Sequence, residues 1–289
     1  MSKPLGNKDN TVADWTPLIL TVAPNGARRT HADHPALPMT PDEIGRCAAA
    51  CAEAGAAMIH LHVRDRDGKH TLDADAYRTA IAAVKREAGP RMVVQVTSEA
   101  VGKYAPAEQM AMVRAVHPEA VSLAVRELIP EGTDEREAAG FFAWLDAERI
   151  LPQFILYSDA DVRRFDDLTA RGIVADGQRF VLFVLGRYSA GQQSSPHDLL
   201  PFLAANRHGH AWAVCAFGRR EAACMLAAAT LGGHGRVGFE NNLYLPDGRV
   251  APDNAALVSA VADGARALGR PLADAATARG IMAGHPGQP

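Results

Sequence analysis

Lysine is scarce in this chain of 289 residues, which carries 30 Lys and Arg side chains against 33 Asp and Glu. The five lysines are Lys3, Lys8, Lys69, Lys85 and Lys103. Every fixed cation after Lys103 is therefore an arginine. Schiff-base catalysis requires a lysine amine, for which a guanidinium group cannot substitute. The part of the chain beyond Lys103 thus excludes this chemistry.

Sequence signals of several other protein classes are also missing. The net charge is −3 and no long basic run is present, so neither nucleic acid nor an anionic membrane is an expected partner. No apolar run approaches the roughly 18 residues of a membrane span, and the first ten residues lack the apolar core of a signal peptide. The four cysteines form no C-x-x-C motif, which is typical of free thiols in a reducing compartment. These features predict a soluble, cytoplasmic protein.

From Pro17 onward, short β-type runs alternate with alanine-rich helical segments, the pattern of a parallel α/β fold. The expected strands cover residues 18–23, 57–63, 92–97, 120–124, 153–157, 179–185, 211–216 and 236–239. The expected helices cover residues 40–53, 73–88, 106–116, 134–146, 160–171, 198–206, 220–231 and 253–268. Eight such units in about 250 residues favour a (β/α)8 TIM barrel over an open doubly wound sheet. No G-x-G-x-x-G follows the first run, which weakens a dinucleotide-binding fold further.

The sequence predicts one catalytic domain. The barrel is expected to cover residues 17–283, because no low-complexity linker or change in composition interrupts that interval. Residues 1–16 are expected to form an N-terminal extension. Residues 284–289 are expected to form a frayed C-terminal tail.

A possible metal site lies at the ends of two expected strands, where TIM barrels carry their catalytic groups. His60 and His62 are two residues apart on one strand, so their side chains point to the same face. Two imidazoles with a third nitrogen or oxygen ligand can hold a divalent ion such as Zn²⁺. Glu240, after the last strand, could supply that ligand across the barrel mouth. The alternatives are two histidines with ordinary polar partners, and a Glu240 carboxylate paired with Arg236 or Arg219.

Other polar residues also fall near expected strand ends. Arginines, which could bind carboxylate or phosphate groups there, recur at Arg28, Arg64, Arg126, Arg187, Arg219 and Arg236. The loop 186–195 suits an anion or a pantetheine arm, with a plain mobile loop as an equal alternative. His31 and His34 are either substrate contacts or solvated loop residues. His208 and His210 precede a strand and are expected at the surface.

Four segments resemble the β-keto acid cleavage enzymes, whose type member is 3-keto-5-aminohexanoate cleavage enzyme. They are PLILTVAPNGA, LPMTPDEIGRCAAACAEAGAAMIHLHVRDRDG, FVLG and GGHGRVGFENNLYLPDG. The resemblance runs from about Leu18 to Met282 and implies a homotetrameric (β/α)8 barrel with a divalent metal, usually zinc. It also implies an enzyme that condenses a β-keto acid with acetyl-CoA, giving acetoacetate and a new CoA ester.

By position in these motifs, the resemblance assigns roles to several residues. The implied metal ligands are His60, His62 and Glu240. Arg236 matches the family's active-site arginine, which orients the keto acid and offsets developing negative charge. Thr97 and Ser122 stand where the family has a serine and a threonine in the substrate pocket, so both positions keep a hydroxyl group.

Departures from the family pattern are as informative as the matches. Asn241 replaces the aspartate that normally follows Glu240, which removes a carboxylate from the acid–base machinery. The family's S-T-G-G segment is here Thr97-Ser98-Glu99-Ala100, so Glu99 becomes the candidate base. A metal-bound hydroxide or a variant reaction is the alternative.

Two pocket positions predict a different substrate charge. Arg28 and Ile155 stand where the type member has acidic residues, and its acid at the Arg28 position recognises the substrate amine. The sequence therefore predicts a neutral or anionic keto acid rather than an aminated one. Arg28, Arg187 and Ser98 are expected among its contacts.

Two other functions stay open at this point. A metal-dependent TIM-barrel hydrolase of the amidohydrolase type also uses an H-x-H motif, although it adds histidines on strands five and six that this chain lacks. A catalytically altered homologue that only binds CoA or an anionic metabolite is the other, because Asn241 removes a catalytic carboxylate. The scarcity of lysine favours a metal over a Schiff base as the electron sink of the β-keto acid cleavage reaction.

Overall fold

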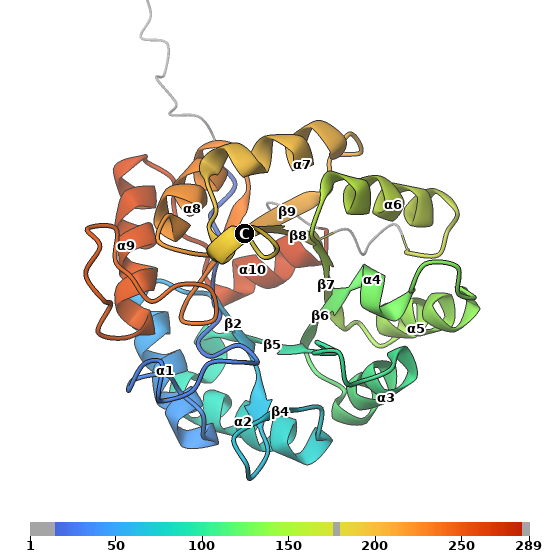
Figure 1. Ribbon diagram of the computed structural model, residues 1–289, viewed down its shortest axis with the longest axis horizontal. Coiled ribbons are helices and arrows are strands. Elements are labelled where there is room, and N and C mark those ends of the chain that lie inside the picture. The colour runs from blue at the N-terminus through green and yellow to red at the C-terminus, as the bar shows by residue number, and fades with distance from the viewer. Residues whose placement is uncertain (1–14, 176–179, 285–289) are drawn as a thin grey trace, which may run out of the picture.

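The computed structural model describes residues 15–175 and 180–284, and within them eight parallel strands close into a barrel (Figure 1). The barrel strands are β1 (Leu20–Val22), β2 (Met58–Leu61), β5 (Val93–Thr97), β6 (Ala120–Ala124), β7 (Leu151–Leu156), β8 (Phe180–Leu185), β9 (Ala211–Ala216) and β10 (His234–Val237). Their order around the ring is β1-β10-β9-β8-β7-β6-β5-β2, and β1 pairs with β2 to close it. The expected TIM barrel is confirmed.

Helices surround the barrel on all sides in Figure 1. They are α1 (Pro41–Ala54), α2 (Ala74–Ala88), α3 (Pro106–Val116), α4 (Val125–Leu128), α5 (Arg136–Ala147), α6 (Asp159–Ala170), α7 (Leu200–Ala205), α8 (Glu221–Thr230), α9 (Asn254–Ala267) and α10 (Ala275–Met282). Short 3₁₀ turns are η1 (Gly89–Arg91), η2 (Ala190–Gln192) and η3 (Pro196–Leu199). Across the described ranges, no helix combines the length and apolar character needed to cross a membrane.

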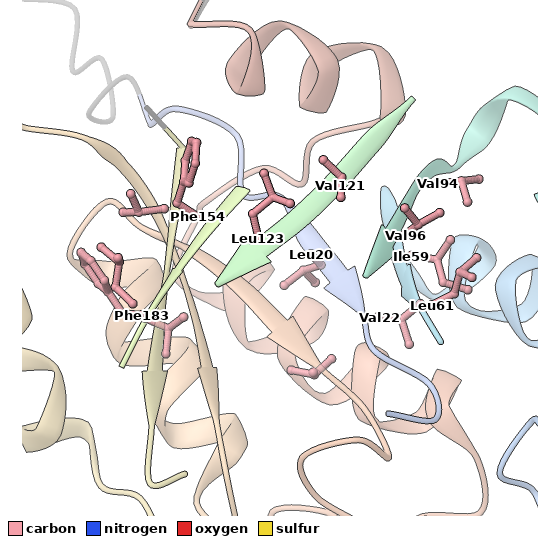
Figure 2. Close-up of a cluster of buried hydrophobic side chains, with 14 of the residues drawn as sticks. Leu20, Val22, Ile59, Leu61, Val94, Val96, Val121, Leu123, Phe154 and Phe183 are labelled. Atoms are coloured by element: carbon pink, nitrogen blue, oxygen red, sulfur yellow. The ribbon is translucent and has the colours of Figure 1, made fainter. Parts of the chain in front are cut away.

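Alternation along the strands separates an outer apolar layer from a partly polar interior. Figure 2 shows part of the outer layer, which packs between the strands and the helices and includes Leu20, Val22, Ile59, Leu61, Val94, Val96, Val121, Leu123, Phe154 and Phe183. Because successive strand residues face opposite sides, the residues between these positions face the barrel axis. His60, Gln95, Thr97, Ser122 and Gln153 are therefore buried inside the barrel.

The structure corrects several sequence-based boundaries. β10 covers 234–237 rather than 236–239, because the chain turns at Gly238, whose φ is +140° and where a Cβ would lie 2.4 Å from the Ala23 carbonyl oxygen. β2 ends early because a hairpin of β3 (Val63–Arg64) and β4 (His70–Thr71) follows it. This hairpin, α4 and α10 were not predicted. The expected strand residue 179, most of the N-terminal extension and most of the tail lie outside the described residues.

One expected surface residue proves to be buried. His210 lies at the start of β9 with its Nε2 atom 2.5 Å from Asp166 Oδ1, whereas His208 is exposed. The prediction of a surface position was therefore wrong for His210 and correct for His208. Neither residue lies at the end of the barrel that carries the H-x-H pair.

Candidate metal centre and substrate cavity

Three predicted ligands meet at the C-terminal end of the barrel. The Nε2 atoms of His60 and His62 lie 3.2 Å apart. Glu240 Oε2 is 3.6 Å from His60 Nε2 and 3.5 Å from His62 Nε2. His60 ends the inward-facing row of β2, His62 follows that strand, and Glu240 lies in the turn after β10, which β1 joins to β2. The barrel closure thus brings together residues that are about 180 positions apart in sequence.

Hydrogen bonds fix which nitrogen of each imidazole faces this centre. His60 Nδ1 lies 2.8 Å from Gln95 Oε1, an oxygen that can only accept, so Nδ1 carries the proton. His70 Nε2 lies 3.1 Å from the Glu99 carbonyl oxygen and must donate to it, which leaves His70 Nδ1 as an acceptor. His62 Nδ1, 3.4 Å from that atom, is then the donor. Both His60 and His62 consequently present an Nε2 lone pair to the centre.

Burial and nearby charges keep the three ligand atoms of this centre unprotonated. Burial lowers the pKa of His60 to about 4 and that of His62 well below its usual range, so both rings are neutral near pH 7. Burial opposes ionisation of Glu240, but the adjacent Arg236 guanidinium holds the Glu240 pKa well below its ordinary value. Arg236 Nη2 lies 3.1 Å from Glu240 Oε1. The other oxygen, Oε2, is buried without a hydrogen-bond partner among the described residues.

Three acceptors without a shared proton repel one another unless a cation lies between them. The two Nε2 atoms and Glu240 Oε2 all lie within 4.8 Å of one another. Neutral imidazole and carboxylate are the ligand types that zinc prefers, and a His₂Glu set is typical of a catalytic site with an open position. The set of three ligands therefore fits a divalent metal. Glu240 also pairs with Arg236, so the ion-pair alternative for Glu240 and the converging arrangement of the three ligands occur together.

A cavity of about 150 Å³ opens beside the three ligands. His60, Glu240 and Arg236 line one side of it, together with Thr97 and Ser122. Arg236 Nε and Nη1 and the Ser122 hydroxyl are buried and have no hydrogen-bond partner among the described residues. Buried polar groups are normally paired, so unpaired donors along one cavity wall indicate where a polar ligand binds.

The opposite side of the cavity differs in character. It is lined mainly by apolar side chains, and these are Ala124, Ile155, Tyr157, Val184 and Phe217. At its rim, Arg28 Nη1 lies 3.3 Å from Glu99 Oε1, and Arg187 Nη2 lies 3.9 Å from the same oxygen. A second carboxylate, Glu127, also lines the cavity and accepts a 2.9 Å hydrogen bond from the Ala100 amide.

Not every predicted site residue reaches this cavity. Thr97, Glu99, Ser122, Arg28, Arg187 and Arg236 line it. Ser98 does not, because it follows inward-facing Thr97 and instead donates to the Ser122 carbonyl oxygen at 3.3 Å. Asn241 is buried outside the lining, and its side-chain amide has no hydrogen-bond partner within the described ranges.

The remaining candidates have structural partners elsewhere. Arg126 pairs with Asp161, Arg219 stacks over Tyr244, and Arg64 donates to the Gly26 carbonyl oxygen. The exposed His31 lies 3.6 Å from Glu43, whereas buried His34 contacts the Ala251 carbonyl oxygen at 2.9 Å. None of these five lines the cavity.

Sequence reasoning missed three residues that shape the site. Gln95 lies two residues before Thr97 on β5, so alternation alone could have placed it beside His60. Glu127 follows β6 and carried no signal as an isolated glutamate in a helical turn. His70 reaches His62 through the β3–β4 hairpin, which sequence periodicity did not reveal.

One family model and several known proteins are similar to this chain in sequence. A model of the beta-keto acid cleavage enzyme family matches residues 17–283. The 3-keto-5-aminohexanoate cleavage enzyme of Fusobacterium nucleatum is 31% identical over 270 residues, covering 92% of this chain and 97% of that protein. The 3-oxoadipate:acetyl-CoA acetyltransferase of Cupriavidus necator is 28% identical, covering 92% and 94%. The 3,5-dioxohexanoate:acetyl-CoA acetone transferase of Paraburkholderia graminis is 27% identical, covering 92% and 95%.

The fold also matches a solved structure. The binary complex of ObcA with oxaloacetate superposes with a TM-score of 0.69 at 18% identity, covering 86% of this chain and 67% of that chain. At this identity the likeness supports the barrel fold alone.

Proposed function

The chain belongs to the beta-keto acid cleavage enzyme family, and from this membership we propose that it condenses a β-keto acid with acetyl-CoA to give acetoacetate and a new CoA ester. Relatives whose names join a keto acid to acetyl-CoA support the reaction type. One observation carries the proposal: the three acceptors of His60, His62 and Glu240 converge beside a cavity that is also lined by Arg236, whose Nε and Nη1 have no partner among the described residues.

We propose that His60, His62 and Glu240 hold Zn²⁺ or another divalent metal. Such an ion supplies Lewis-acid polarisation of the 3-oxo group and stabilises the negative charge that appears when a carbon–carbon bond beside a carbonyl breaks. Gln95 and His70 orient the two imidazoles for this task.

Arg236 is proposed to bind the substrate carboxylate and offset developing negative charge. Its Nη2 contacts Glu240, and Nε and Nη1 remain without a hydrogen-bond partner among the described residues. A carboxylate oxygen can accept a charge-assisted hydrogen bond from a guanidinium N–H of this kind. The hydroxyl groups of Thr97 and Ser122 line the same side and are proposed to help orient the keto acid.

Glu99 is proposed to act as the general base, because the Asn241 amide cannot accept a proton at neutral pH. The Glu99 side chain lines the cavity, and burial together with the charge of Glu240 raises its pKa. Glu99→Gln keeps the shape and removes the base, so kcat should fall by roughly 10²- to 10⁴-fold. Steady-state kinetics measures this, with metal content as the control. Unchanged turnover would exclude Glu99 as the base.

The proposed substrate is a keto acid with a neutral or anionic side chain. Arg28 supports this, because by the resemblance it stands where the type member has the acid that recognises the substrate amine, and that acid is missing here. We further expect a cytoplasmic homotetramer. The resemblance implies the tetramer, and the four cysteines, all free thiols, favour a reducing compartment.

The decisive experiment incubates the purified protein with acetyl-CoA and a panel of β-keto acids, with mass spectrometry to identify the CoA ester. A new CoA ester and acetoacetate are expected, and both should disappear after chelation and return on addition of Zn²⁺. Hydrolysis without a CoA ester would favour a hydrolase instead. Metal-replete protein that binds CoA without converting any keto acid would indicate a binding protein.

A further inference from the structure

We propose that the keto acid carries an uncharged, mainly hydrocarbon side chain, which lies against the cavity wall formed by Ala124, Ile155, Val184 and Phe217. This inference rests on the proposed function, which supplies the keto acid and fixes its carboxylate end at Arg236. It narrows the range of substrates from neutral or anionic to neutral. The argument uses the wall, the charges at its rim and the size of the cavity.

The wall is continuous because its residues come from neighbouring strands. Ala124 on β6 is the direct register partner of Ile155 on β7, and Val184 lies on the next strand, β8. Phe217 follows β9 and donates its backbone amide to the Leu185 carbonyl oxygen at 3.0 Å, which holds it beside β8. None of these four side chains offers a hydrogen bond, and Tyr157 adds a hydroxyl group to this side of the cavity. A charged group placed against the four would lose water without gaining a hydrogen-bond partner.

The charges at the rim cancel. Two guanidinium groups, Arg28 and Arg187, and two carboxyl groups, Glu99 and Glu127, line the cavity. Glu99 lies between both cations at 3.3 and 3.9 Å, and the Glu127 carboxylate is held by the Ala100 amide. No excess of either sign is left to select a charged side chain.

The remaining cation of the lining is also engaged. Arg29 donates to the Phe239 carbonyl oxygen, on the side of the cavity that carries Glu240. It therefore belongs to the metal side and not to the wall. A cavity of about 150 Å³ accommodates a benzene-sized molecule in other proteins, and here the same space also holds the carboxylate end of the keto acid, so the side chain is short.

The names of the relatives indicate keto acids that differ in side-chain charge. Their names describe keto acids with an amine, with a second carboxylate and with a second keto group. The family thus handles all three charge types, and the wall and balanced rim of this chain match the neutral one.

The test compares three β-keto acids of equal chain length: 3-oxohexanoate, 3-oxoadipate and 6-amino-3-oxohexanoate. The metal-replete enzyme should give a kcat/KM for 3-oxohexanoate at least about tenfold above that of either charged compound. A higher value for a charged compound would overturn the inference. If no compound yields a CoA ester, the proposed function fails instead, so the two failures are distinguishable.

Variants of the rim test the same inference by unbalancing its charge. Glu127→Gln leaves an excess of positive charge and should raise kcat/KM for 3-oxoadipate about tenfold. Arg187→Gln leaves an excess of negative charge and should do the same for the aminated compound. Glu53→Gln is the control, because this carboxylate pairs with Arg91 far from the cavity lining. Selectivity that stays unchanged in both rim variants would contradict the role of the balanced rim.

Discussion

The two ends of the barrel contain the same kinds of buried polar residues, but these residues differ in how completely they are hydrogen-bonded. At the N-terminal end, His234 Nδ1 accepts a 3.0 Å hydrogen bond from the Ile19 amide. Arg270 is 1% exposed and donates to the carbonyl oxygens of Ala229 and Gly233 at 2.6 and 2.7 Å and to that of Thr16 at 3.0 Å. All of these hydrogen bonds join residues of the chain itself.

At the C-terminal end, the corresponding groups are incompletely paired. Arg236 is buried like Arg270, yet its Nε and Nη1 have no partner among the described residues, and Glu240 Oε2 is likewise unpaired. Leaving a buried polar group unpaired costs about 1–3 kcal/mol, so such groups persist where a ligand satisfies them. Arg236 and Arg270 are of the same type and are both buried, so hydrogen-bond satisfaction is the property that distinguishes them.

The largest expected contrast is between the two buried arginines. Arg236→Met should lower kcat/KM by roughly 10²- to 10³-fold, because it removes the donors that we propose to bind the substrate carboxylate. Arg270→Met should lower the free energy of unfolding by about 3 kcal/mol or more, since several buried carbonyl oxygens lose their donor. Steady-state kinetics and urea unfolding of both metal-loaded variants measure the two effects.

The distinction between the two arginines fails if both substitutions lower activity or if both lower stability. Loss of activity in Arg270→Met at a temperature where the variant is folded would show that the N-terminal end also contributes to catalysis. A comparable loss of stability in Arg236→Met would show that its unpaired donors are structural.

Local patterns in the sequence predicted the eight-unit barrel and the convergence of His60, His62 and Glu240, because both follow from short-range rules. Alternation placed His60 and His62 on one face, and strand-end position selected Glu240, although β10 is displaced by two residues. What could not be predicted depends on long-range packing. His70 reaches His62 by way of a hairpin with no periodic signal, and the balance between Glu127 and Arg187 joins two loops whose spacing only the closed barrel defines.

A second contrast concerns two histidines at opposite ends of the barrel, His70 and His234. His70→Leu removes the acceptor that orients His62, so the dissociation constant for Zn²⁺ should rise about 10- to 100-fold. His70→Asn should restore most of the affinity, because its side-chain oxygen can replace Nδ1. His234→Leu should leave Zn²⁺ affinity unchanged and destabilise the fold by about 1–3 kcal/mol.

Competition with a chromophoric chelator measures these affinities, and thermal unfolding of the metal-free proteins shows whether each variant folds. Equal affinity in the wild type and His70→Leu would mean that His62 is oriented without His70. A loss of affinity in His234→Leu would remove the distinction between the two ends.

The smallest expected contrast uses two glycines in the left-handed region. Gly26 has φ +59°, and a Cβ there would lie 2.6 Å from Glu240 Cγ; Gly232 has φ +89°, and a Cβ there would contact nothing within 4 Å. Substitution by alanine should cost each protein about 1 kcal/mol of unfolding free energy from backbone strain. Gly26→Ala should in addition displace the Glu240 side chain and raise the Zn²⁺ dissociation constant about tenfold, whereas Gly232→Ala should leave it unchanged. Equal Zn²⁺ affinities in the two variants would show that the Glu240 carboxylate adapts to the added methyl group, and hence that the metal centre is less rigidly preorganised than the close packing of Gly26 against Glu240 indicates.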